Sequence, residues 1–237
     1  AQPPLVSEDS RGQPDPRSWL IDLSCYRDLG DGGAESMVLN ADAGTVTVNT
    51  GVREDELDAF LTARNWMLKT VTAGGFFSLG GMTAVDVHGA TVDAPIFAET
   101  VTAFSIMGPD GAVSVIDRDS PSMQGWSPLQ FARVSLGALG VVTSVTIEVM
   151  PRPWATTLSS GRDNNIVCSQ LQDFIAQFQP LLATHDRIES FFNPYTHRFL
   201  ALWWDIVDSP AVRTPNLNPQ VPNACQLAGE EVFGAPY

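Results

Sequence analysis

The residues best suited to ligand chemistry lie in one short stretch, from Thr72 to Ala90 (TAGGFFSLGGMTAVDVHGA). It contains two glycine pairs on either side of a serine, followed by a histidine and a further glycine: Gly74, Gly75, Ser78, Gly80, Gly81, His88 and Gly89. Glycine has no Cβ, so its backbone can adopt positive φ and can approach a ligand to van der Waals distance. A serine hydroxyl can hydrogen-bond a phosphate oxygen. The stretch therefore predicts a loop that closely approaches an anionic ligand, in preference to a set of simple turns between strands.

The glycine spacing matches neither the dinucleotide fingerprint GxGxxG nor the phosphate loop GxxxxGK[ST]. A different source of anion binding is available, because Met82 to His88 can form a short helix that begins at the pair Gly80-Gly81. Amide groups exposed at the start of such a helix would suit an anion such as a pyrophosphate.

The other candidate catalytic residues have simpler structural interpretations. His185 and His197 are expected at the surface, and no two histidines have zinc-ligand spacing with a supporting cysteine or aspartate. The acidic run at 54–56 (EDE) suits the first turn of a helix, where acids complement the helix dipole. Asp86 lies in an apolar run and needs a partner or an exposed face, so we expect it to cap backbone groups. The absence of a G-x-S-x-G elbow argues against a serine hydrolase.

The composition is that of an acidic globular protein. The 237 residues are 44% hydrophobic, and 27 acidic against 13 basic residues give a formal net charge of −14. This charge disfavours binding to nucleic acid or to anionic membranes. No apolar run approaches the roughly 20 residues that span a bilayer, and we expect a signal peptide to be absent or already removed. The three cysteines, Cys25, Cys168 and Cys225, have no CxxC spacing, which argues against a metal or redox motif.

The elements that would position the loop alternate between strands and helices. Two hairpins are predicted, Met37–Leu39 with Thr45–Thr50 and Val101–Met107 with Ala112–Ile116. Further strands are predicted at Trp19–Leu23, Val141–Val149, Arg187–Asn193 and Phe199–Val207, helices at Arg53–Arg64, Leu129–Val134 and Ser169–Leu182, and a Pro- and Asn-rich loop at 209–224. We predict α+β architecture with an irregular segment at 1–18, a first domain at 19–150 and a second at 151–237, after prolines that break the preceding strand.

The motifs of the first domain resemble a known family. TVTVNTGV, then GGFFSLGG and VHG, a PDG hairpin and SLGALGVVTSVTIEV occur in an order and approximate spacing similar to the FAD domain of the vanillyl-alcohol-oxidase and p-cresol-methylhydroxylase (VAO/PCMH) superfamily. The resemblance implies the second half of a VAO/PCMH-type FAD-binding domain, with FAD as cofactor. It implies FAD contacts at the following residues: Gly74, Gly75, Ser78, Leu79, Gly80, Gly81, His88, Gly89, Gly140, Val141 and Val142. His88 is expected to be fixed by hydrogen bonds near the cofactor and not to carry a covalent flavin link.

The second domain is similar to the start of the substrate domain of class II, FAD-linked cholesterol oxidases. This resemblance rests on residues 187–205 (RIESFFNPYTHRFLALWWD), a Pro- and Asn-rich stretch and the final GAPY. It implies an FAD-dependent oxidase of a secondary alcohol, with a 3-hydroxysteroid such as cholesterol as substrate and hydrogen peroxide as the product from O2. Trp203, Trp204, Phe191 and Phe192 favour such an apolar cavity. The alternatives are a sugar, alditol or aldonolactone oxidase, and a flavin-free subunit or binding module that retains the fold.

Parts of the family pattern have no counterpart in the sequence. These are the first βαβ half, with its basic-glycine-histidine segment for the pyrophosphate, and the catalytic carboxylate and arginine. We therefore expect other polypeptide segments or chains to complete the FAD domain, and we leave the catalytic residues unassigned. The acidity and the family's habit point to a secreted or periplasmic protein, with a cytoplasmic location as the alternative.

Overall fold

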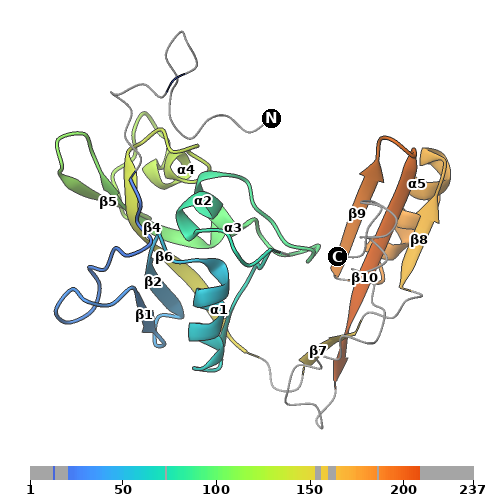
Figure 1. Ribbon diagram of the computed structural model, residues 1–237, viewed down its shortest axis with the longest axis horizontal. Coiled ribbons are helices and arrows are strands. Elements are labelled where there is room, and N and C mark those ends of the chain that lie inside the picture. Colours follow the sequence, from blue (N-terminus) through green and yellow to red (C-terminus); the bar gives the residue numbers. More distant parts are fainter. Residues whose placement is uncertain are drawn as a thin grey trace.

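The computed structural model describes residues 13, 21–72, 74–152, 156–159, 164–185 and 187–208, and contains two antiparallel sheets with their own helices (Figure 1). In these ranges no helix is both long and apolar enough to cross a membrane. The mixture of sheet and helix confirms the predicted α+β class. The loop predicted at 209–224 and nearly all of the segment predicted at 1–18 lie outside the described residues.

The first sheet is built around its longest strand. Its order is β1-β2-β6-β4-β5, and β3 pairs with the end of β6. The strands are β1 (Met37–Asn40), β2 (Thr45–Asn49), β3 (Trp66–Leu68), β4 (Val101–Met107), β5 (Val113–Asp117) and β6 (Val141–Pro151). β6 is central because its Val-, Thr- and Ile-rich run buries alternate residues, with Val145, Ile147 and Val149 all at most 5% exposed. Both predicted hairpins, β1-β2 and β4-β5, are confirmed.

Short helices cover the sheet and enclose the core (Figure 1). They are α1 (Glu54–Thr62), α2 (Leu79–Ala84), α3 (Phe97–Thr100) and α4 (Pro128–Ala132). Helical periodicity in α1 buries Leu57 and Leu61 against the sheet, and α2 buries Leu79 and Met82 in the same core. Helices α1 and α2 therefore share one core with β2 and β6, and the glycine-rich stretch leads from β3 into α2.

The second sheet centres on β10 (Arg198–Asp208). It pairs with β7 (Thr156–Ser159), β8 (Asn165–Cys168) and β9 (Arg187–Asn193), all antiparallel. Helix α5 (Leu171–Leu182) packs on one face through Phe174, whose ring centroid lies 5.6 Å from that of Phe199. The loop after α2 contacts the second sheet at β9, where the Ile188 N–H donates to the Ala90 carbonyl at 2.8 Å and Thr91 forms a β-bridge with Arg187.

Some predicted elements differ from those observed. Ile21 to Leu23, the described part of the strand predicted at Trp19–Leu23, does not form a strand, because the chain turns there and the Tyr26 N–H donates to the Leu23 carbonyl. The helix predicted at Met82–His88 begins earlier, after Ser78, and ends at Ala84. The helix predicted at Leu129–Val134 is confirmed but ends at Ala132 (α4).

The aromatic and apolar residues of the second sheet also differ in part from expectation. Of the predicted apolar face of α5, Phe174 is buried but Leu171 and Ile175 are exposed. Trp204 packs beside a cluster of buried leucines, whereas Trp203 stacks on the half-buried ring of His185 at 5.1 Å. Both histidines were predicted at the surface; His197 is exposed, whereas His185 is half-buried.

Candidate functional site

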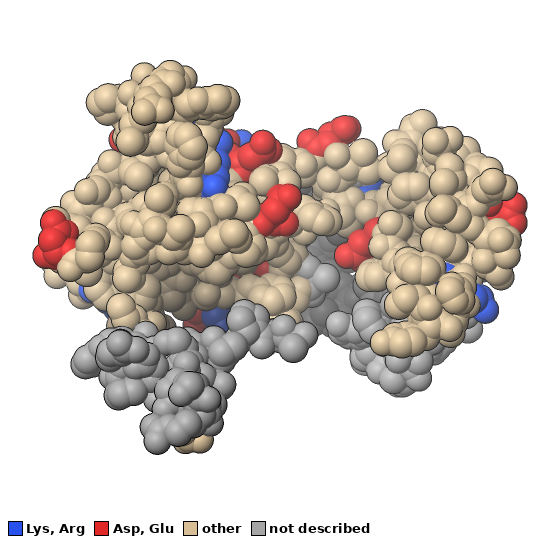
Figure 2. Space-filling view, turned by 90° about the horizontal axis from the view of Figure 1, so that it is seen from above, with Lys and Arg blue, Asp and Glu red and all other residues tan. Residues whose placement is uncertain are grey.

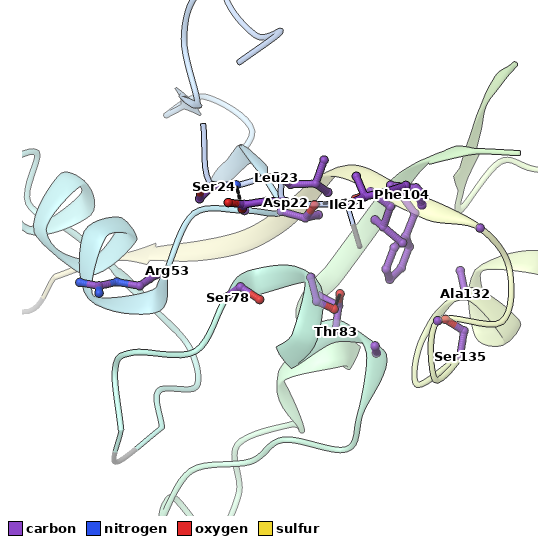
Figure 3. A pocket seen from close by; sticks show the side chains of 18 of the residues that line it. Ile21, Asp22, Leu23, Ser24, Arg53, Ser78, Thr83, Phe104, Ala132 and Ser135 are labelled. Carbon is purple, nitrogen blue, oxygen red and sulfur yellow. Dashed lines mark hydrogen bonds between the residues drawn. The ribbon is translucent and has the colours of Figure 1, made fainter. Parts of the chain in front are cut away.

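A cavity of about 600 Å³ opens beside the start of α2, in the part of the chain that forms the first sheet (Figure 3). Among the described residues, five separate parts of the chain line it: the chain at 21–24, the turn after β2, the glycine loop with α2, Phe104 of β4, and the connection from α4 into β6. The lining residues include Ile21, Asp22, Leu23, Ser24, Thr50, Gly51, Arg53, Phe76, Ser78, Gly80, Thr83, Ala84, Phe104, Ala132, Ser135, Gly137, Gly140, Val141 and Val142. Its volume lies within the range of about 300–1,000 Å³ typical of small-molecule sites.

The cavity combines an apolar floor with hydroxyl groups around it. Phe104 of β4 is 1% exposed and forms part of the floor. In Figure 3, Thr83 and Ser135 lie on opposite sides of the space next to Phe104. The Thr83 hydroxyl donates to the Gly80 carbonyl at 3.1 Å and keeps its lone pairs as acceptors. Such a lining can hold a flat apolar ring against the floor, and the Thr83 hydroxyl can accept a hydrogen bond from a ligand hydroxyl.

Hydrogen bonds to the first turn of α1 fix the glycine loop. The Glu54 N–H donates to the Phe77 carbonyl at 3.0 Å, and the Asp55 N–H donates to the Gly75 carbonyl at 2.7 Å. Gly75 has φ of +63°, so the chain turns here through the left-handed region that favours glycine. The loop therefore runs along α1 before it enters α2.

The start of α2 is not the open anion site that the sequence suggested. Ser78 is the N-cap and its Oγ accepts from the Gly81 N–H at 3.4 Å. The Leu79 N–H donates to the Val52 carbonyl at 2.9 Å, and the Gly80 N–H donates to the Thr50 carbonyl at 3.0 Å. Because protein acceptors already occupy these amides, the prediction that they would hold a pyrophosphate is wrong for the conformation observed.

The structure brings some of the predicted FAD-contact residues together and separates others. The following line the cavity: Ser78, Gly80, Gly140, Val141 and Val142. Leu79 is buried in the core, and Gly81 is exposed on the other side of the helix start. Gly74 and Gly75 belong to the loop beside α1, outside the cavity lining.

His88 and Gly89 also lie away from the cavity, towards the second sheet. An added Cβ on Gly89 would meet the Val71 carbonyl oxygen at 2.5 Å, so this glycine serves backbone packing. His88 is exposed, with Nδ1 3.2 Å from the Gly89 carbonyl oxygen. Burial raises the pKa of Glu189 in β9, and the nearby His88 lowers it by a smaller amount.

Two lining glycines have different physical roles. An added Cβ on Gly140, where φ is +128°, would lie 2.5 Å from the Met107 carbonyl oxygen, so this glycine allows β6 to start close beside β4. At Gly137 a Cβ would meet no protein atom within 4 Å, and the backbone there is open to a ligand.

Sequence reasoning missed much of the lining. Gly137 belongs to the SLGALG connector, and Gly51 follows the TVTVNT strand, so a glycine signal existed for both. Thr83 and Ser135 lie inside motifs that the sequence analysis quoted but were not picked out as ligand contacts, and Phe104 belongs to no such motif.

The charges around the cavity are mostly already paired. Arg53 is held in an ion pair with Asp55 at 2.7 Å, and its side chain points away from Thr83 and Ser135 in Figure 3. The Ser24 N–H donates to Asp22 Oδ1 at 2.9 Å and lowers the pKa of that carboxyl. Figure 2 shows acidic side chains spread over the face in view. Asp86 is exposed. Within the described ranges no group of three or more His, Cys, Asp or Glu residues is placed to hold a metal ion.

Comparison with known proteins identifies the ligand class. The model of the FAD binding domain family matches residues 17–117. L-gulonolactone oxidase from Mus musculus is 30% identical over 107 residues, 45% of this chain and 23% of the relative. D-arabinono-1,4-lactone oxidase from Eremothecium gossypii is 27% identical over 160 residues, 67% of this chain and 26% of the relative. Alditol oxidase from Streptomyces sp. is 28% identical over 137 residues, 53% of this chain and 32% of the relative.

These relatives sharpen the resemblance inferred from the motifs. They belong to the aldonolactone and alditol oxidase branch of the VAO/PCMH superfamily, and the expected closeness to cholesterol oxidases is not among the findings. The chain spans between about a quarter and a third of the length of the three relatives. The segment at residues 17–117 is similar to the FAD binding domain family, and the cofactor that the comparisons indicate for this chain is FAD.

Proposed function

We propose that the chain is part of an FAD-dependent oxidase that acts on a hydroxyl-bearing carbon of an aldonolactone or alditol, with O2 as acceptor and hydrogen peroxide as product. The relatives with lactone and alditol oxidase names support this choice over a steroid substrate. FAD, when bound, supplies the acceptor for the hydride of the alcohol carbon, and the protein supplies binding and orientation.

The observation that carries the proposal is the cavity formed by the glycine loop and the start of β6. It gathers Ser78 and Gly80 from one motif and Gly140 to Val142 from another, although these segments lie about sixty residues apart in the sequence. Its apolar floor suits the adenine ring, and its hydroxyls suit the ribose and phosphate oxygens. We infer that the residues present bind the adenosine end of FAD.

The start of α2 has its amides occupied, so the pyrophosphate needs further donors. We propose that these come from other segments or chains that complete the FAD domain. The same completion would supply the catalytic groups. Among the described residues that line the cavity, Asp22 and Arg53 are the charged ones, and each already has a hydrogen-bond partner within the chain.

The test places a larger side chain in the cavity. Ala84 lines the cavity and is half-buried, so Ala84→Phe places a ring in the space proposed for FAD. Ala59→Phe is the matched control, because Ala59 is exposed on α1 and does not line the cavity. In the full-length protein, Ala84→Phe should lower the flavin content, measured by its visible absorption, while Ala59→Phe retains it.

A substrate panel separates the enzyme proposal from its alternatives. We expect peroxide formation with aldonolactones or alditols and not with 3-hydroxysteroids.

Flavin that stays bound in Ala84→Phe would contradict the cavity assignment. Wild-type protein without flavin would instead favour the flavin-free binding module.

A further inference from the structure

Glu54 is a buried acid that the proposed FAD site does not use directly. It lies in the first turn of α1 and is 1% exposed. Burying a carboxylate is costly unless hydrogen bonds replace its lost hydration. The identity of its partners therefore indicates what the residue is for.

Both carboxylate oxygens of Glu54 bind one residue at the beginning of the glycine loop. The Thr72 N–H donates to Oε1 at 2.6 Å, and the Thr72 hydroxyl donates to Oε2. The backbone of the same glutamate holds the end of the loop, because its N–H donates to the Phe77 carbonyl at 3.0 Å. One residue thus ties both ends of the loop at 72–77 to α1.

Apolar burial does not hold this loop. Phe76 is 63% exposed and Phe77 is 44% exposed, and their rings pack in a tilted arrangement with centroids 4.3 Å apart. Since neither ring is buried in a core, the hydrophobic effect contributes less to the position of the loop than it would for buried rings. Among the described residues, Glu54 and Asp55 hold the loop through hydrogen bonds with Thr72, Gly75 and Phe77.

Ser78 connects the position of the loop to the wall of the cavity. Ser78 follows Phe77 and forms a β-bridge with Arg53, next to Glu54 in the chain. Phe76 and Ser78 both line the cavity, and Ser78 also caps α2. A shift of the loop would therefore move one wall of the cavity.

We infer that Glu54 is a positioning residue that locks the glycine loop against α1 and so sets the wall of the FAD cavity. The inference rests on the proposed function for its ligand, but the locking of the loop is a property of the chain itself.

The test compares an apolar and an isosteric substitution in the full-length protein. Glu54→Leu removes both acceptors, whereas Glu54→Gln can accept from the Thr72 N–H through its amide oxygen and donate to the Thr72 hydroxyl through its amide nitrogen. We expect Glu54→Leu to weaken FAD binding by at least about tenfold and Glu54→Gln to stay within about threefold of wild type. Fluorescence titration of the apoprotein measures the Kd.

Amide hydrogen exchange without FAD measures directly how well the backbone amides of the loop are protected. Glu54→Leu should accelerate exchange in the peptide that contains Thr72 and Ser78, and Glu54→Gln should restore protection. Glu56→Leu is the matched control, because Glu56 lies in the same turn and accepts from the Arg53 N–H at 2.9 Å without touching the loop at Thr72. It should leave exchange in that peptide unchanged. If Glu54→Leu does not fold, Thr72→Val, which removes only the hydroxyl contact, should produce the same changes at smaller size.

The outcomes separate this inference from the proposed function. Unchanged loop exchange in the folded Glu54 and Thr72 variants, or faster exchange with wild-type FAD affinity, would overturn it. Equal losses in Glu56→Leu would attribute the effect to α1 as a whole and would also overturn it. Failure of wild-type protein to bind FAD would refute the proposed function instead, and the exchange comparison would still decide whether Glu54 locks the loop.

Discussion

Asp58, in the middle of α1, is predicted to destabilise the fold at neutral pH. Burial, together with the charges of Glu54 and Asp55, raises the pKa of its carboxyl from 3.8 to about 6, and Arg152 offsets this in part. The folded state therefore binds this proton more tightly than the unfolded state. Stability falls as pH rises between about 4 and 6, and the full penalty remains above pH 6.

The magnitude follows from the size of the pKa change. A rise of about two units corresponds to about 3 kcal/mol at most. Because the side chain is only half-buried and solvent screens its interactions, we expect about 1.5 kcal/mol. Replacing Asp58 with Asn removes the charge and should raise the free energy of unfolding by this amount at pH 8, or the Tm by roughly 3–6 °C.

The assay is urea or thermal unfolding of wild type and Asp58→Asn at pH 8 and at pH 3.5. At pH 3.5 the two proteins should differ by less than about 0.5 kcal/mol, because the carboxyl is then protonated in the folded state and mostly protonated in the unfolded one. An equal stabilisation at both pH values would attribute the effect to something other than charge. A less stable variant at pH 8 would refute the reasoning.

Two further substitutions test other parts of the structure. Gly140→Val should lower stability by at least about 2 kcal/mol even without FAD, because φ is +128° and a Cβ would meet the Met107 carbonyl; an unchanged urea midpoint would contradict this close approach of β6 and β4. Hydrogen bonds from Lys69 and Arg118 lower the pKa of Glu148, so its contribution is present above pH 4.5 and is lost as pH falls through its folded pKa. Glu148→Gln should therefore cost about 0.5–1 kcal/mol at pH 7 and low salt, with a smaller effect at 1 M NaCl, and a salt-independent loss in unfolding experiments would count against the ion pairs.

Local patterns predicted the regular elements well where one strong signal was present. The β-branched run of β6, the turn residues of both hairpins and the helical spacing of α1 each determine their element through short-range sequence. The strand expected at Trp19–Leu23 failed in its described part because a strand needs a partner, and Ile21 to Leu23 instead lie over Gly51, where a Cβ would overlap the Leu23 carbonyl.

The candidate site could be predicted only in part for a similar reason. Glycine signals identified Gly80 and Gly140, but the sequence could not tell whether a glycine approaches a ligand or another strand, and Gly140 and Gly89 turned out to pack against backbone. The amides of α2 looked available in the sequence, yet Thr50 and Val52 occupy them through tertiary contacts. Phe104 gave no signal because only the folded sheet brings it to the cavity.

The most direct measurement of the central claim is hydrogen exchange of the full-length protein with and without FAD. If FAD occupies the cavity, protection should rise in the segments at 21–24, 76–84 and 135–142, which line it from three sides. Segments of the second sheet such as α5 should change much less. Protection by FAD that is absent from these three segments, or that falls mainly elsewhere in the described chain, would contradict the account.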